Sequence, residues 1–246
     1  MSLMRCIIVA SVISLAVAPA KADLIVNGSF EAPLVPVGGF TNFGAGSTAI
    51  TGWRVVGVDS AVTSGTFTQS GIVFQAQDGI QWLDLAGVTS NSMSSGVTQD
   101  VATILGEVYE LNFYVGSATG GGFFFPATVD LSINGSARVS YFNPTGPANS
   151  LDWKLFSVPF TATGTTTKLT FFNGSASNNF LGALDKVSLN AVPEPASVIL
   201  LGIGGASMVV IGIARRRRRI KSSDCETGET GGKTDRDRFS TAAQGK

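Results

Sequence analysis

The sequence predicts an all-β protein built as a single sandwich. Residues 23–192 are rich in Gly, Ser, Thr, Asn, Val and Phe, and short runs of alternating apolar and polar residues recur along them. Turn residues separate these runs about every 10–15 positions, which is typical of a sandwich. No part of this segment has a helical period. The segment is long enough to bury a sizeable core, and it has the usual size of one domain.

The clearest strand is 127–134, in which Val129, Leu131 and Ile133 share one face. The pair Asn134-Gly135 then suits a tight turn with positive φ, and 137–142 forms the return strand. Nine further runs are expected to be strands: 24–30, 51–58, 72–76, 80–86, 96–102, 108–115, 154–161, 167–173 and 183–189. Two of these strands carry apolar stripes that should line the core: Tyr109, Leu111, Phe113 and Val115, and Phe156, Val158 and Phe160.

The N-terminal segment 1–22 has the features of a secretory signal peptide. Arg5 gives the charged start, residues 6–18 are apolar, and Ala20-Lys21-Ala22 is a small-x-small cleavage site for signal peptidase. The two cysteines, at positions 6 and 225, lie outside the predicted exported domain at 23–191. We therefore expect no disulfide in that domain.

The C-terminal part predicts one transmembrane helix. Residues 196–214 are uncharged and apolar, and a helix of this length matches the ~30 Å hydrocarbon core of a bilayer. The arginines that follow should stay in the cytoplasm, so the sandwich lies outside it and 220–246 forms a disordered cytoplasmic tail. These arginines are Arg215, Arg216, Arg217, Arg218 and Arg219.

The same region resembles the PEP-CTERM sorting signal. The resemblance rests on three elements in order over 192–219: a Val-Pro-Glu-Pro motif, the apolar run and the arginine cluster; the motif is Val192, Pro193, Glu194 and Pro195. It implies recognition by an exosortase, an intramembrane protease of bacteria that make exopolysaccharide, with cleavage near the motif and transfer to the cell surface or matrix. The chain departs from the usual signal by continuing beyond the arginines. The alternative is an ordinary single-pass anchor without sorting.

Charge and composition exclude several functions. The segment 23–192 has eleven acidic and five basic residues, so nucleic-acid binding is not expected. The chain has no histidine, and so it lacks the commonest general base and metal ligand. A glycosidase needs only two carboxylates, and five acidic residues remain candidates on that ground: Glu31, Asp84, Glu107, Glu110 and Asp185. We nevertheless predict that the protein is not an enzyme.

Aromatic residues beside polar ones are the candidate ligand-binding residues. Phe123, Phe124 and Phe125 follow a glycine run and cannot all point inward if extended; they form either a ligand-binding lip or core packing. Trp153, with Asp152 beside it, begins a strand after a loop, and for this pair both interpretations stay open. Trp53 and Trp82, the latter with Gln81 and Asp84 beside it, lie on predicted strands; they are expected to be buried in the core, and ligand binding is the alternative.

Four short motifs resemble the DUF642 and choice-of-anchor group of proteins. They are Asn-Gly-Ser-Phe-Glu at 27–31, Ile-Thr-Gly-Trp at 50–53, Trp-Leu-Asp-Leu at 82–85 and Ala-Leu-Asp-Lys-Val at 183–187. The resemblance implies a galactose-binding-like jelly roll, and plant members of the group are associated with cell-wall polysaccharide. The function predicted is an exported, non-enzymatic binder of polysaccharide or extracellular matrix. The alternative is a purely structural or adhesive surface protein with no small ligand.

The resemblance also implies a structural calcium ion. In similar jelly rolls such an ion ties the first strand to the last, and its carboxylate ligands would here be Glu31 and Asp185. The alternative is that Glu31 caps a turn and Asp185 accepts backbone amide hydrogen bonds, with no ion.

Overall fold

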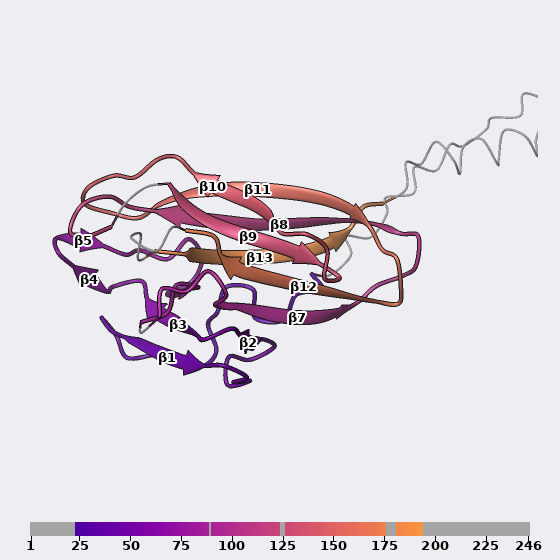
Figure 1. The fold of residues 1–246 in the computed structure, drawn as a ribbon, viewed down its shortest axis with the longest axis horizontal. Helices are drawn as coiled ribbons and strands as arrows, with labels where there is room; N and C mark the ends of the chain where they lie inside the picture. The colour runs from indigo at the N-terminus through magenta and orange to yellow at the C-terminus, as the bar shows by residue number, and fades with distance from the viewer. Residues whose placement is uncertain (1–22, 89, 124–125, 176–180, 194–246) are drawn as a thin grey trace, which may run out of the picture. The chain divides into compact units, whose positions relative to one another are not determined.

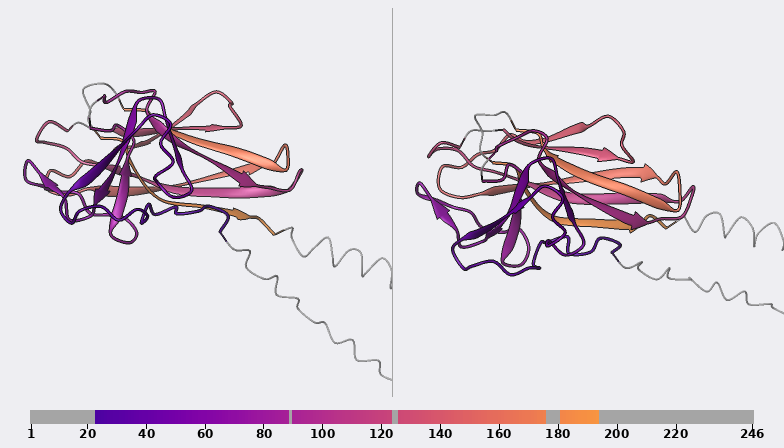
Figure 2. Two further views of the ribbon diagram at one scale, coloured as in Figure 1. Left: turned by 90° about the horizontal axis from the view of Figure 1, so that it is seen from below. Right: turned by 60° about the horizontal axis from the view of Figure 1, so that its bottom comes forward.

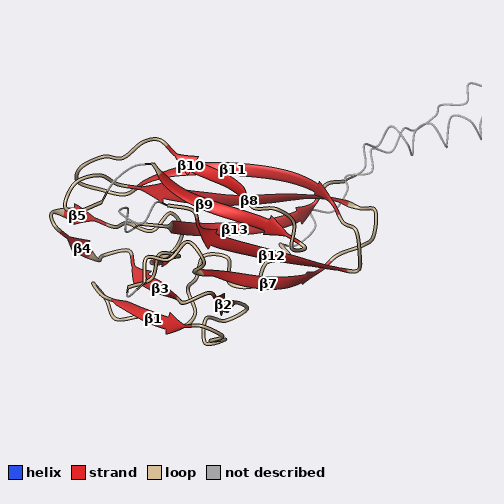
Figure 3. Cartoon of the chain, viewed as in Figure 1, coloured by secondary structure: helices blue, strands red, loops and turns tan. Residues whose placement is uncertain are grey.

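The computed structural model describes residues 23–88, 90–123, 126–175 and 181–193. The predicted signal peptide, Phe124, Phe125, the predicted transmembrane helix, the arginine cluster and the tail lie outside these ranges, as do Glu194 and Pro195. The described part forms thirteen strands and no helix (Figure 3). It accordingly contains no helix that could cross a membrane.

The strands form two antiparallel sheets (Figure 1; Figure 2 gives two further views). The six-stranded sheet has the order β1 (Phe40–Gly44), β3 (Asp59–Ser64), β6 (Gln81–Asp84), β13 (Ala183–Ala191), β8 (Val108–Ser117) and β11 (Asp152–Thr161). The five-stranded sheet has the order β10 (Val139–Asn143), β9 (Ala127–Ile133), β12 (Thr166–Asn173), β7 (Gly96–Ala102) and β2 (Arg54–Val56). A separate hairpin pairs β4 (Thr68–Gln69) with β5 (Ile72–Val73). From β7 onward the chain passes repeatedly between the two sheets, which makes the domain a jelly-roll β-sandwich.

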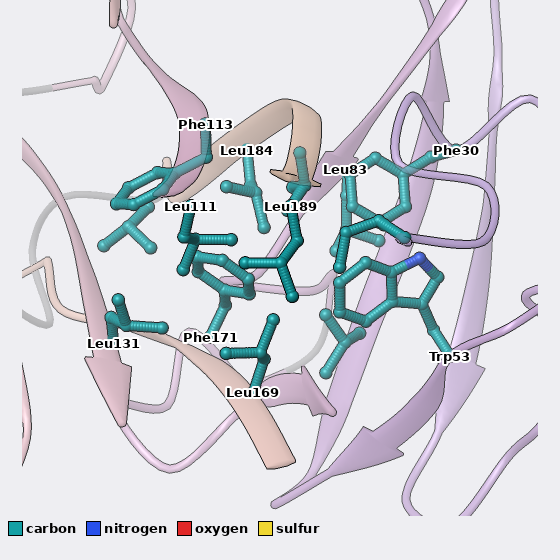
Figure 4. Packing of buried hydrophobic residues seen from close by; sticks show 14 of the residues in the cluster. Phe30, Trp53, Leu83, Leu111, Phe113, Leu131, Leu169, Phe171, Leu184 and Leu189 are labelled. Atoms are coloured by element: carbon teal, nitrogen blue, oxygen red, sulfur yellow. The ribbon is translucent and has the colours of Figure 1, made fainter. Parts of the chain in front are cut away.

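The main core fills the space between the sheets (Figure 4). Along β8, Tyr109, Leu111, Phe113 and Val115 are buried in it, as their alternation predicts. The predicted stripe on β11 also packs against this core but stays partly buried, because β11 is an edge strand with a neighbour on one side only.

Several strands differ from the sequence prediction. Segment 24–30 is not a strand, because the chain turns there through positive φ at Asn27 (55°) and Phe30 (56°). Strands β1, β3 and β4 were not predicted. All six residues of β3 are buried, so it has no alternation of buried and exposed positions, and β4 is only two residues long. The hairpin turn is confirmed, with positive φ at Asn134 (53°) and Gly135 (75°).

A second hydrophobic cluster covers the outer face of the six-stranded sheet. On β6, Leu83 points into the main core, whereas Trp82 points to the opposite face. We call this second group the outer cluster; it consists of Ile72, Phe74, Trp82, Ala118, Phe123, Ala127, Leu151, Leu181 and Ala183. The hairpin β4–β5 and the segment that leads to Phe123 supply its cover. The outer face of this sheet is therefore packed under loops, and the candidate site lies there.

Candidate functional site: an aromatic pocket beside Asp84

A pocket of about 230 Å3 opens beside the outer cluster. Strands β1, β3 and β6 of the six-stranded sheet contribute one side of it, and the segment that carries the hairpin β4–β5 contributes another. Five aromatic rings line it, from Phe40, Phe67, Phe74, Trp82 and Phe123. Its polar lining comes from the side chains of Thr63, Gln69 and Asp84.

The aromatic rings form a continuous wall centred on Phe74. The Phe74 ring centroid lies 6.0 Å from that of Trp82, 5.1 Å from that of Phe123 and 5.6 Å from that of Phe67. Phe67 in turn contacts Phe40 edge to face at 5.7 Å. The indole N–H of Trp82 donates to the Phe74 carbonyl oxygen at 3.1 Å, which fixes the two residues together. Because Phe74 is buried and Phe40 is 40% exposed, the wall runs from the interior to the surface.

Asp84 lines this pocket and is half-buried as a residue. Its Oδ1 accepts hydrogen bonds from the backbone N–H groups of Ala86 (3.0 Å) and Gly182 (3.2 Å). Its Oδ2 has no hydrogen-bond partner among the described residues. The register neighbours of Asp84 on both sides are alanines, Ala61 on β3 and Ala183 on β13, so no large side chain covers it from the adjacent strands.

Burial raises the pKa of the Asp84 carboxyl to about 7. The two backbone hydrogen bonds oppose this shift, and the neighbouring carboxylate of Asp59 adds to it. No lysine or arginine is among the described residues that line the pocket. The described lining of the pocket thus combines aromatic rings with one carboxyl group and no basic side chain.

Phe124 and Phe125 lie outside the described residues; of Phe123, Asp152 and Trp153, Phe123 lines the pocket, where it is 7% exposed and packs edge to face on Phe74. The ring centroid of Trp153 lies 6.2 Å from that of Trp82, and the indole N–H of Trp153 donates to the Gln75 carbonyl oxygen at 2.9 Å. Asp152 accepts a hydrogen bond from the Thr145 hydroxyl. The structure therefore does not bring Asp152 and Trp153 into the pocket, and their part in ligand binding stays a prediction.

Sequence reasoning missed most of the pocket. Phe40, Phe67 and Phe74 were not singled out. Trp82 with Asp84 was a candidate, although burial of the tryptophan in the core was the preferred interpretation; the two residues are two positions apart on a strand, so they share a face. Phe67 and Phe74 flank a hairpin whose strands are too short to show a pattern.

Glu31 and Asp185 both bind the loop 77–81, but through backbone amides. Glu31 Oε1 accepts from the N–H groups of Ile80 and Gln81, both at 2.9 Å. Asp185 is fully buried; its Oδ2 accepts from Gln77 (2.8 Å) and Asp78 (3.0 Å), and its Oδ1 accepts from Lys186 (2.7 Å), each through the backbone N–H.

These contacts do not fit a calcium site. A cation needs oxygen ligands, whereas N–H donors point at both carboxylates. Among the described residues, no group of three or more Cys, Asp or Glu side chains is placed to hold a metal. The structure therefore does not support the calcium ion, and the hydrogen-bonding alternative accounts for both residues.

Three of the four sequence motifs, at 27–31, 50–53 and 183–187, are joined by hydrogen bonds. Asn27 donates its side-chain amide to the Thr51 carbonyl oxygen at 3.0 Å, and the indole N–H of Trp53 donates to the Asn27 carbonyl oxygen at 3.1 Å. Val187 N–H donates to the Gly28 carbonyl oxygen at 2.9 Å, and a Cβ at position 28 would lie 1.9 Å from the Val187 oxygen. Only glycine allows this approach between the opening segment and the last strand.

Two solved carbohydrate-binding modules are similar to this chain over their whole length. The xylan-binding CBM22-1 domain of Paenibacillus barcinonensis Xyn10C has 16% identity and a TM-score of 0.37, with 65% of this chain and 100% of that chain covered. A family 35 carbohydrate-binding module from Clostridium thermocellum has 14% identity and a TM-score of 0.38, with 61% and 98% covered. A longer protein, the GH26-CBM35 β-(1,4)-mannanase of Podospora anserina, has 15% identity and a TM-score of 0.38, with 64% and 29% covered.

Sequence comparison identifies the family. Halomucin of Haloquadratum walsbyi is 29% identical over 219 residues, which are 85% of this chain, and the chain spans only 2% of the length of halomucin. Residues 191–219 match the PEP-CTERM protein-sorting motif, as predicted. Residues 23–190 match the family described as a protein of unknown function, DUF642, and the chain belongs to this family.

Proposed function

We propose that this protein is exported and that its sandwich binds polysaccharide or extracellular matrix without catalysing a reaction. The aromatic pocket beside Asp84 is the observation that carries the proposal. Sugar rings stack their C–H faces on aromatic rings, and their polar groups pair with carboxylate and amide oxygens. The pocket offers both kinds of contact, with Phe40 and Phe67 toward its mouth and the free Oδ2 of Asp84 inside it.

The arrangement of carboxylates favours binding over glycoside hydrolysis. A glycosidase requires two carboxylates that flank the scissile bond. Asp84 is the one carboxylate among the described lining residues. The nearby Asp59 is 2% exposed, and it accepts hydrogen bonds from the side-chain amide of Asn42 at 3.0 Å and from the hydroxyl of Ser90. It is therefore held away from solvent and from any substrate.

Export and sorting follow from the ends of the chain. The signal peptide would direct secretion, the apolar run would hold the precursor in the inner membrane, and an exosortase-type protease would process it near the motif. The last backbone hydrogen bond of the sandwich here joins Val192 N–H to the Val108 carbonyl oxygen at 2.9 Å, and Pro193 has no amide proton to donate. This supports a sorting segment that begins where the sandwich ends.

A binding experiment tests the pocket. The full chain would be kept in a polyoxyethylene detergent, because detergents with sugar or choline headgroups could occupy the pocket, and tested against a panel of immobilised glycans. We expect saturable binding that is lost in Phe40→Ala. Phe142→Ala is the matched control, since Phe142 is 51% exposed but lies on β10 in the other sheet. A silent panel at high protein concentration would instead support the purely structural or adhesive alternative.

A separate experiment tests sorting. In a bacterium that has an exosortase, replacing Glu194 and Pro195 with alanine should leave the precursor unprocessed, with its apolar run still attached. The measurement is the mass of the mature protein in the wild type and in the variant. An unchanged mature mass would show that this motif does not direct cleavage.

A further inference from the structure

The described lining of the pocket contains the carboxyl group of Asp84 and no lysine or arginine. The ion pairs in the described part of the chain join Lys168 to Asp100 and Lys186 to Asp78, and neither pair involves Asp84. The described cations that lie over aromatic rings sit on Phe172, Phe142, Phe156 and Tyr114, which are not pocket residues. The segments 89, 124–125 and 176–180, which the structure does not describe, contain no lysine or arginine.

The aromatic rings of the pocket and the carboxyl group of Asp84 favour the same kind of ligand, a cation. The face of an aromatic ring carries partial negative charge, so a cation near several ring faces is attracted by about 0.5–2 kcal/mol, and more strongly where water is excluded. The Asp84 carboxyl beside the same rings adds a negative charge when it is ionised. A ligand with hydroxyl groups alone would leave this charge without a partner, whereas an ammonium group would satisfy both the rings and Asp84.

Resting on the proposed polysaccharide binding, we propose that the pocket binds a sugar residue that carries a protonated amine, such as a hexosamine without its N-acetyl group. The cavity of about 230 Å3 is smaller than the ~300–1,000 Å3 of pockets for drug-sized ligands, so it suits one sugar residue rather than a length of chain. The amine would pair with Asp84 Oδ2, and the rings of Phe40 and Phe67 would contact the sugar at the mouth.

The environment of Asp84 gives the binding of a permanent cation, used as a probe, a measurable signature. The pKa of Asp84 is raised by burial and by Asp59 on β3, while β13 presents the uncharged Ala183 to it. A bound cation would favour the ionised carboxylate and lower this pKa. Binding of a permanently charged ammonium ion should therefore release protons at neutral pH, and its affinity should increase as the pH is raised from 5 to 8.

The test compares deacetylated and N-acetylated glucosamine oligomers of equal length, titrated calorimetrically into the full chain in polyoxyethylene detergent. We expect about tenfold tighter binding of the deacetylated oligomer, the ratio that about 1.4 kcal/mol gives. Asp84→Asn should remove this difference, because the amide oxygen can still accept the two backbone hydrogen bonds but carries no charge. Asp100→Asn, in the exposed Lys168 pair, should keep it. Circular dichroism would verify that both variants fold.

Other outcomes separate this inference from the function on which it rests. Equal affinity for both oligomers would overturn the amine proposal and leave polysaccharide binding intact. Failure of every glycan would overturn both. Tight binding of tetramethylammonium without binding of any amino sugar would overturn the assignment to a sugar and point to a methylated ammonium group instead. In the remaining outcome, Asp84→Asn and Phe40→Ala both still bind the deacetylated oligomer more tightly than the N-acetylated one. That result would place recognition outside this pocket and overturn the proposal.

Discussion

The two hydrophobic clusters of the sandwich differ in what covers them. Two sheets close the main core, and each places alternate apolar side chains into the space between them. The outer cluster has a sheet on one side only, and its cover is the hairpin β4–β5 with the segment that leads to Phe123. Loops lack the regular spacing that interlocks side chains, so the outer cluster leaves a pocket. The difference indicates that the main core supplies stability and that residues of the outer cluster are available for binding a ligand.

The two buried tryptophans show the same contrast. Trp53 and Trp82 are each 2% exposed, and each donates its indole N–H to a backbone carbonyl oxygen. Trp53 packs against Phe30 and Phe171 within the main core. Trp82 lines the pocket and shares its face of β6 with Asp84. A similarly buried side chain thus serves packing in one region and lines the proposed binding pocket in the other.

The largest expected effect is that of Phe113→Ala in the main core. Phe113 is fully buried and contacts the rings of Tyr141, Phe156 and Phe171 at centroid distances of 5.1–5.8 Å. The cavity left behind should lower the free energy of unfolding by about 3–5 kcal/mol. Urea unfolding of the full chain in detergent measures this, with the exposed Leu155→Ala as control. A loss below about 1 kcal/mol would contradict the role given to the main core.

The same substitution in the outer cluster, Phe123→Ala, should cost less stability and more affinity. Phe123 packs on Phe74 but borders the pocket, so its ring already lacks neighbours on one side. We expect the free energy of unfolding to fall by about 1–3 kcal/mol. Glycan affinity should fall by about tenfold, since an aromatic wall is lost. If Phe113→Ala and Phe123→Ala were equally destabilising, the two clusters would not differ in the way proposed.

The main core was predictable from sequence, whereas most of the pocket was not. The alternation in β8 identified Leu111 and Phe113 as core residues, because both sheets bury one face of this strand. The pocket depends on contacts between distant segments: β1 brings Phe40 beside Phe67, and no local pattern records that contact. Glu31 and Asp185 were expected to hold a calcium ion between the first strand and the last, which the structure does not support; sequence could not show that backbone N–H groups of residues 77–81 would be their partners.

A smaller effect is expected from pH. Burial raises the pKa of Asp84 and of Asp185 to about 7, above the value of 3.8 for an exposed aspartate. The folded state therefore binds these protons more tightly than the unfolded state, so their contribution to stability is greatest below pH 4 and is lost as the pH rises toward 7.

We expect the free energy of unfolding to fall as the pH rises from 5 to 7, and the dependence to weaken in Asp84→Asn. Urea midpoints measured across this range, with Asp100→Asn as control, test the prediction. Identical slopes in the wild type and in Asp84→Asn would mean that the pocket carboxylate is already ionised at pH 5.

The smallest expected effect is that of calcium, for which we predict no change in melting temperature. An ion that binds only the folded state at a hundredfold excess over its Kd would stabilise it by about 2.7 kcal/mol, and thus raise the melting temperature by several degrees. Glu31 and Asp185 instead use their oxygens to accept five backbone hydrogen bonds, and a cation would have to displace these donors to reach them. Thermal unfolding in calcium and in chelator should therefore coincide. A stabilisation by calcium that disappears in Asp185→Ala would restore the ion as the tie between the opening segment and the last strand, and would require loop 77–81 to take a different conformation when the ion is bound.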